Sequence, residues 1–201
     1  MPHAPDPQRP RTKPAQVRLE ELMDAAEALF LQRGVEATTI SDIVQAADVA
    51  KGTFYTYFNS KAEILHALAQ RYTTRFMDEV GQALDAQPAD DCLARLRSWI
   101  EANIDVYVRT HAVHDVVYSQ HHHLGRGNAE RNAIQQQLLQ LLEAGIAGGH
   151  WALPAPAVTA SLIYSGVHGA TDDLIAAPED QRTAFKHALI ADCLRLVGAT
   201  R

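Results

Sequence analysis

The sequence predicts an all-α protein of about nine helices. Apolar residues recur with helical spacing in nearly every segment from residue 15 onward. Glycine and proline fall mostly between these segments, and no segment has the sustained apolar–polar alternation that is typical of a strand. Of the 201 residues, 47% are hydrophobic and 21% are charged, which is the composition of a folded globular protein rather than a disordered one.

The helices are expected to form two parts, separated by a break at 85–91 that contains Pro88. We expect a flexible basic tail at 1–14, an N-terminal domain at 15–81 and a C-terminal domain at 82–201. The expected helices are 15–33, 40–47, 51–57 and Asn59-Ser60 to about 81 in the first domain, and 91–109, 111–123, 128–148, 155–176 and 179–198 in the second.

Residues at the expected helix ends carry specific signals. Gly34 follows the first helix and is a stop signal. Thr39 and Asp42 have the spacing of a capping box at the start of the second helix, and Ser60 and Glu63 repeat that spacing at the start of the fourth.

Composition also limits the class of protein. No run of 18 uncharged apolar residues is present, and the proline-rich N-terminus has no apolar block, so we expect neither a transmembrane helix nor a secretory signal. Cys92 and Cys193 are too few to staple the fold, so we expect reduced thiols in a cytoplasmic protein. The net charge is −6, whereas residues 1–18 carry +3, which is compatible with phosphate contact at one end only.

The second and third helices, joined by the short turn at 48–50, form a helix-turn-helix pattern. In such a pair the first helix braces the second, which presents its N-terminal residues to the DNA major groove. That helix needs small or polar residues at its start, with hydroxyls and a cation nearby. The residues that meet this need are Lys51, Gly52, Thr53, Thr56 and Tyr57, whereas Phe54 and Phe58 are expected to face the core.

The stretch from Thr38 to Leu65, with Ala25–Phe30 and Gly34 before it, resembles the signature of the TetR family of transcriptional regulators over residues 16–76. The resemblance implies a three-helix DNA-binding module linked by a fourth helix to a helical body that binds a ligand and dimerises. It also implies base contacts near the start of the third helix, phosphate or methyl contacts further along it, and helix N-termini near the DNA backbone. The residues so assigned are Thr39, Lys51, Gly52, Thr53, Tyr55, Thr56, Tyr57 and Lys61. A plain surface role is the alternative for Lys61.

One turn residue departs from the family pattern. The family usually has glycine where this chain has Asp48, at a position that tends to need a positive φ, which aspartate tolerates better than most residues. Its negative charge near DNA is expected either to weaken phosphate attraction or to alter the choice of operator. The basic tail, with Arg9, Arg11 and Lys13, is expected either to compensate by reaching the DNA or to be idle.

In the body, the resemblance implies dimerisation through the last two helices. Small residues follow one side of 155–176 and larger apolar residues one side of 179–198. The interface candidates are Ser161, Ser165, Gly169, Phe185, Leu189 and Leu196. The alternative is that these residues pack within one subunit.

The ligand candidates are aromatic or polar residues of the body, chosen by residue type and helix face. They are Trp99, Asn103, Tyr107, His111, His114, Tyr118, Tyr164 and His168. His111 and His114 share a helix face with His121 or His122. This face is either a metal- or pH-responsive site or a solvated polar face. We expect no metal and no cofactor.

The sequence therefore predicts a homodimeric, cytoplasmic regulator that associates with the nucleoid when bound to its operator. The resemblance implies a repressor that binds a palindromic DNA operator and is released by a small-molecule effector, and we expect no membrane partner. Nucleophile-elbow, P-loop, dinucleotide-binding and CxxC motifs are all absent from the sequence, so no enzyme is expected. A metal- or pH-responsive regulator is the main alternative, and a helical enzyme or adaptor that keeps the helix-turn-helix as scaffold is the other.

Overall fold

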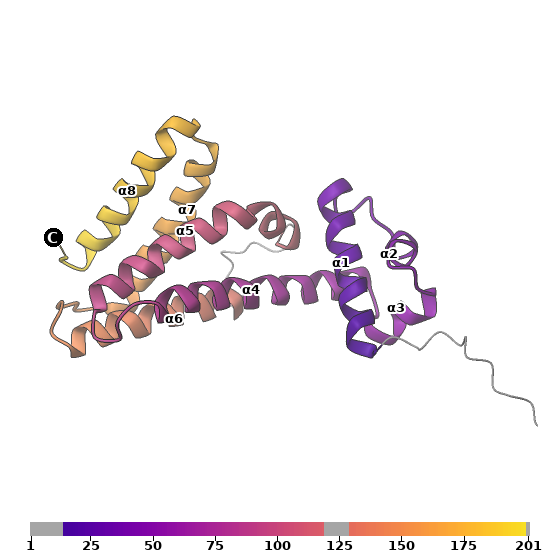
Figure 1. Cartoon of the computed structure of the whole chain (residues 1–201), viewed down its shortest axis with the longest axis horizontal. Helices are drawn as coiled ribbons and strands as arrows, with labels where there is room; N and C mark the ends of the chain where they lie inside the picture. The colour runs from indigo at the N-terminus through magenta and orange to yellow at the C-terminus, as the bar shows by residue number, and fades with distance from the viewer. Residues whose placement is uncertain (1–13, 119–128, 200–201) are drawn as a thin grey trace, which may run out of the picture. The chain divides into compact units, whose positions relative to one another are not determined.

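A computed structural model describes residues 14–118 and 129–199 (Figure 1). Within these ranges the protein is entirely helical, which confirms the predicted fold class. The helices are α1 (Ala15–Arg33), α2 (Ile40–Ala46), α3 (Lys51–Tyr57), α4 (Lys61–Asp85), α5 (Cys92–Val117), α6 (Ala129–Ala147), α7 (Pro156–Ala176) and α8 (Glu179–Leu196). None of these described helices combines the length and the apolar character needed to cross a bilayer.

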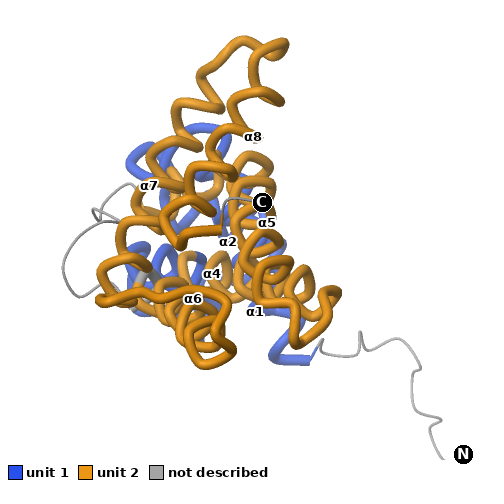
Figure 2. Tube along the Cα trace, turned by 90° about the vertical axis from the view of Figure 1, so that its left-hand side faces the viewer, with its two compact units in different colours: residues 1–68 blue, residues 69–201 orange. Residues whose placement is uncertain are grey.

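The chain divides into two compact units after Leu68 (Figure 2). Unit 1 comprises residues 1–68 and unit 2 residues 69–201. The division falls inside α4, so this continuous helix contributes its first two turns to unit 1 and the remainder to unit 2. The boundary at 81/82 that the sequence indicates stays a prediction.

Unit 1 is a small three-helix domain closed by the start of α4. Phe30 of α1, Ile43 of α2 and Phe54 of α3 are almost completely buried, and α2 packs against both α1 and α3. Phe54 and Phe58 are both buried, with ring centroids 5.7 Å apart, as the sequence predicts. Burying these rings fixes which face of the short helix α3 is left outside.

Local signals determine where the helices of unit 1 begin and end. Gly34 ends α1 with φ +85°, and Asp48 adopts φ +52° in the turn between α2 and α3. The expected capping box is present: the Thr39 hydroxyl accepts from the Asp42 N–H at 3.2 Å, and the Asp42 carboxylate accepts from the Thr39 N–H at 2.8 Å. At α4 the Ser60 hydroxyl accepts from the Glu63 N–H in the same way (3.2 Å).

Unit 2 is a helical bundle in which α5 packs against α6, α7 and α8. Its core contains a set of completely buried side chains from four helices: Val80, Leu96, Trp99, Ile100, Ile104, Leu138, Leu142 and Ile163. The long helix α5 therefore forms the centre of the bundle.

One helix break that we predicted from the sequence was wrong. We expected separate helices at 91–109 and 111–123, whereas α5 is continuous from Cys92 to Val117. Neither glycine nor proline stands at Thr110-His111, and the Thr110 hydroxyl donates to the Val106 carbonyl (2.7 Å), a bond made inside a helix. Residues 119–123 lie outside the described residues.

Candidate functional site

The first candidate site is the outer face of α3. Phe54 is buried, whereas Lys51, Gly52, Tyr55 and Thr56 are exposed; half of the Tyr55 surface is accessible. Thr53 and Tyr57 are partly buried. The structure thus places the expected base-reading residues on one side of a short helix whose other side is fixed in the core.

The fold does not require glycine at position 52. A Cβ atom added at this position would meet no atom of the described chain within 4 Å, and its φ is not in the left-handed region. An alanine would fit and would favour the helix more than glycine does. The missing side chain therefore leaves bare helix backbone facing outward, where a partner can approach closely.

Two of the predicted contact residues on α3 also make bonds within unit 1. The Tyr57 hydroxyl donates to the Ala15 carbonyl at the start of α1 (3.0 Å), and the Thr56 hydroxyl donates to the Gly52 carbonyl (3.1 Å). Tyr57 therefore links α3 to α1. Its role in contacting phosphate stays a prediction, as does that of Thr56.

The N-terminus of α2 is occupied by a carboxylate. The Asp42 carboxylate accepts from the Thr39 hydroxyl (2.6 Å) and pairs with Arg33 (2.8 Å). Hydrogen bonds from Thr39, and then the Arg33 charge, hold the pKa of Asp42 below its usual value. A phosphate that approaches the start of α2 through Thr39 would thus meet an ionised aspartate.

Lys61 holds the loop between α1 and α2. Its ammonium donates to the carbonyls of Val35 (2.6 Å), Thr38 (3.1 Å) and Glu36 (3.4 Å). The sequence offered only a phosphate contact or a solvated surface for this residue, because carbonyls of a loop more than twenty positions earlier leave no local pattern. Any phosphate would have to share the Lys61 ammonium with these carbonyls.

Cations are scarce in the described part of unit 1. Residues 14–68 contain four lysines and arginines against eight aspartates and glutamates. Lys51 is the exposed cation at the start of α3. The predicted basic contacts of Arg9, Arg11 and Lys13 lie outside the described residues.

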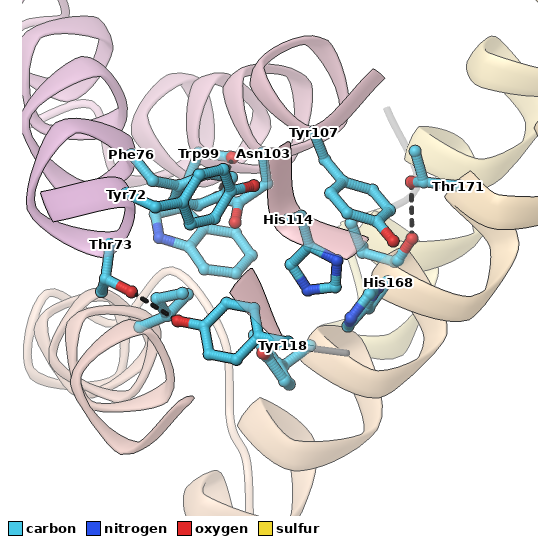
Figure 3. A pocket seen from close by; sticks show the side chains of 13 residues that line it. Tyr72, Thr73, Phe76, Trp99, Asn103, Tyr107, His114, Tyr118, His168 and Thr171 are labelled. Atoms are coloured by element: carbon cyan, nitrogen blue, oxygen red, sulfur yellow. Dashed lines mark hydrogen bonds between the residues drawn. The ribbon is translucent and has the colours of Figure 1, made fainter. Parts of the chain in front are cut away.

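The second candidate site is a pocket inside unit 2, with about 460 Å³ of empty space that includes some open to solvent (Figure 3). Thirteen side chains from α4, α5, α6 and α7, together with Tyr118 just after α5, line it: Tyr72, Thr73, Phe76, Trp99, Asn103, Tyr107, His114, Tyr118, Ile134, Tyr164, Val167, His168 and Thr171.

Seven of the eight ligand candidates from the sequence line this pocket. The exception is His111, whose Nδ1 lies 2.9 Å from the Val108 carbonyl of its own helix. The sequence did not identify the α4 contribution of Tyr72, Thr73 and Phe76, although the rings of Tyr72 and Phe76 stand four positions apart and so share a helix face. Ligand binding by these residues stays a prediction.

His114 lies at the centre of an aromatic cluster in the pocket (Figure 3). Its ring centroid is 4.9 Å from that of Tyr107, 5.0 Å from that of Tyr118 and 5.3 Å from that of His168. Its Nδ1 lies 3.1 Å from the Asp115 carboxylate. Burial lowers the pKa of His114 in spite of that carboxylate, so the ring is neutral at pH 7.

The hydroxyl and amide groups that line the pocket also bond to the protein. The Thr73 and Tyr118 hydroxyls are 2.8 Å apart, the Tyr107 hydroxyl donates to Asp172 (2.7 Å), and Asn103 donates to the Trp99 carbonyl (2.8 Å). Burial raises the pKa of Tyr107, so its phenol stays protonated. These bonds fix the orientation of the lining groups before any ligand arrives.

No metal centre is apparent in the part of the chain that the structure describes. No three His, Cys, Asp or Glu residues there are grouped to hold an ion. His121 and His122, which the metal alternative needs, lie outside that part.

The outer faces of α7 and α8 carry exposed apolar side chains. Leu162, Val158 and Leu196 are 59%, 58% and 51% exposed. Of the predicted interface residues, Ser165, Gly169 and Leu196 are exposed and Ser161 is partly exposed, whereas Phe185 and Leu189 are half-buried against the core of unit 2. Val158 and Leu162 were not among the predicted interface residues, which on this helix were the small ones.

Comparison with known proteins supports a regulatory role. The family model for bacterial regulatory proteins of the tetR family matches residues 22–68. The HTH-type transcriptional regulator TtgR of Pseudomonas putida is 30% identical over 112 residues, which cover 54% of this chain and 53% of TtgR, so the chain spans about half the length of this relative. The HTH-type transcriptional repressor KstR2 of Rhodococcus jostii is 28% identical over 142 residues, 66% of this chain and 67% of KstR2.

The fold of both units has counterparts among solved structures. A putative tetR family transcription regulator from a Shewanella species has a TM-score of 0.69 to this chain at 19% identity, covering 94% of this chain and 98% of that one. At this identity the likeness concerns the fold.

The carbonyl cradle of Lys61 leads to a prediction about stability. Lys61→Met keeps most of the aliphatic stem but removes the donors, so we expect the free energy of unfolding in urea to fall by about 1–2 kcal/mol. Lys51→Met, at an exposed lysine of the same unit, serves as control and should change it by less than about 0.5 kcal/mol. An unchanged stability of Lys61→Met, together with a DNA-binding salt dependence reduced by one phosphate contact, would instead support the phosphate role.

Proposed function

We propose that this chain, whose residues 22–68 match the family model for bacterial regulatory proteins of the tetR family, is a dimeric repressor whose operator binding is opposed by a small molecule. The observation that supports this most directly is the outward polar face of α3, fixed by buried Phe54 and Phe58 and lacking a side chain at Gly52. Because the matched relatives and structures are regulators, we propose no enzymatic activity.

At the operator, the start of α3 enters the major groove. Lys51 and Thr53 supply a cation and a hydroxyl for base edges, and the bare backbone at Gly52 lets the helix approach closely. Two such helices in a two-fold dimer would read half-sites about 34–36 Å apart, which makes the operator a palindrome. Such a protein acts in the cytoplasm, at the nucleoid.

Electrostatic attraction to DNA is concentrated at few positions. Since residues 14–68 carry an excess of acidic side chains, Lys51 and the basic residues of the tail, Arg9, Arg11 and Lys13, supply the phosphate contacts in this proposal. Removing the tail should then lower both the affinity and its salt dependence.

The effector acts through α4. Tyr72, Thr73 and Phe76 line the pocket, while Lys61, at the start of the same helix, holds the loop that leads into α2. A ligand that shifts α4 would therefore disturb the DNA-binding unit through one continuous helix. Coupling between two such sites typically amounts to about 1–3 kcal/mol.

The dimer forms through the outer faces of α7 and α8. Leu162, Val158 and Leu196 would be covered by the partner, and the small residues Ser165 and Gly169, further along α7, allow close helix approach. Apolar side chains exposed to this degree on adjacent helices are typical of an interface.

We expect Gly52→Ala to separate folding from DNA binding. The methyl group should leave unfolding stability unchanged or raise it by about 0.5–1 kcal/mol, since glycine disfavours a helix. It should weaken binding to a site selected from random duplex DNA by roughly tenfold or more, about the value of one lost base contact. Affinity would be measured by fluorescence anisotropy at fixed salt.

Gly81→Ala is the matched control, because a Cβ there also meets no atom within 4 Å but lies in unit 2. It should leave DNA affinity unchanged. If no palindrome is selected, or if Gly52→Ala binds DNA as tightly as the wild type, the proposed contact between the start of α3 and the bases is wrong.

We expect Leu162→Glu to convert the dimer to a monomer at micromolar concentration, because it places charges in an apolar contact. Sedimentation equilibrium measures the change. Leu31→Glu, at another exposed leucine, is the control and should remain dimeric. A wild-type monomer, or a Leu162→Glu variant that stays dimeric, would contradict the assigned interface.

A further inference from the structure

The chemistry of the pocket lining restricts what can occupy it. Eight of the thirteen lining side chains are aromatic or imidazole rings: Tyr72, Phe76, Trp99, Tyr107, His114, Tyr118, Tyr164 and His168. The aliphatic lining is limited to Ile134 and Val167. A guest in this pocket is therefore surrounded mainly by rings.

None of the thirteen lining residues is lysine, arginine, aspartate or glutamate. A charged guest would give up part of its hydration without a charged lining group to pair with, which is costly. Two carboxylates contact residues of the lining: Asp172 accepts from the Tyr107 hydroxyl, and Asp115 lies beside His114. These negative charges make an anionic guest less favourable still.

The rings are arranged edge to face. The Tyr107 ring lies at 87° to that of His114 and at 82° to that of His168, with centroids 4.9 and 4.8 Å apart. Such a cluster presents both ring faces and ring edges, and a flat aromatic guest can pair with either. Each ring pair contributes about 2- to 12-fold to affinity beyond the area that it buries.

Polar groups are few and already oriented. The Thr73–Tyr118 hydroxyl pair and the Asn103 amide hold fixed positions through bonds to the protein, as Figure 3 shows for the hydroxyl pair. A hydroxyl oxygen in such a pair can still take part in one further hydrogen bond. These groups suit a guest with one or two hydroxyl or carbonyl groups.

We infer that the pocket takes an uncharged aromatic molecule that carries at least one hydroxyl or carbonyl group. The inference rests on the proposed function in that it treats this pocket as the effector site. The lining, which has no charged side chain and many rings, selects the chemical class of that effector.

The test compares four probes that share one carbon skeleton. They are 2-naphthol, which is neutral; 2-naphthoate, an anion; 2-naphthylmethylammonium, a cation; and decahydro-2-naphthol, which is neutral but not aromatic. Binding to the full chain without DNA is measured at pH 7 by calorimetry and by quenching of tryptophan fluorescence, since Trp99 lines the pocket. We expect 2-naphthol to bind at least tenfold more tightly than each of the other three.

A pair of variants locates the binding. His168→Leu removes a lining ring at similar size and should weaken 2-naphthol binding about 2- to 10-fold, while leaving decahydro-2-naphthol unchanged. His150→Leu makes the same change outside the pocket and should alter neither. The comparison of probes on the wild type stands even if His168→Leu is unstable.

The outcomes separate the inference from the proposed function. Tighter binding of the anion, the cation or the saturated alcohol, or no binding of 2-naphthol, overturns the assigned class even if the protein binds an operator. Binding of 2-naphthol that His150→Leu weakens and His168→Leu does not overturns the assigned pocket. Binding as expected supports the inference even if operator affinity does not respond, in which case it is the regulatory proposal that fails.

Discussion

The helix α4 is continuous from Lys61 to Asp85 and takes part in both units. Lys61 in its first turn and Tyr72, Thr73 and Phe76 further along therefore belong to one hydrogen-bonded element. The first of these residues fastens the loop before α2, and the other three form a wall of the pocket. In our account, a ligand in the body acts on DNA binding because it pushes on this helix.

Each unit combines a buried core with a candidate site that the core positions. In unit 1 the buried rings of Phe54 and Phe58 and the bond from Tyr57 to Ala15 orient α3, which leaves Gly52 exposed. In unit 2 the edge-to-face rings around His114 hold a pocket open without any charged lining group. The reading surface is thus polar and the pocket aromatic, which is why they would recognise such different partners.

Much of unit 1 could be predicted from the sequence because its signals are local. The Thr39–Asp42 box, the stop at Gly34 and the positive φ at Asp48 each involve residues at most three positions apart. The break expected at Thr110-His111 was wrong because a polar pair was taken as a joint, whereas threonine can bond back inside a helix. A helix end normally needs a stronger signal, such as glycine or proline.

The candidate sites could be predicted only in part. Residue type and helix face identified most of the pocket rings on α5 and α7, but the wall from α4 depends on how distant helices pack, which periodicity cannot give. The cradle of Lys61 was missed for the same reason, since its acceptors are backbone carbonyls of a distant loop. Leu162 is a candidate contact because it is exposed, and the exposure of single α7 residues is known only from the structure.

If pocket and operator are coupled through α4, the affinity of each site for its partner must depend on whether the other site is occupied. The measurement determines the operator dissociation constant with and without saturating 2-naphthol, and the 2-naphthol dissociation constant with and without saturating operator. The account predicts that each partner weakens the other by the same factor, roughly 5- to 150-fold. Bound 2-naphthol that leaves operator affinity unchanged would contradict it.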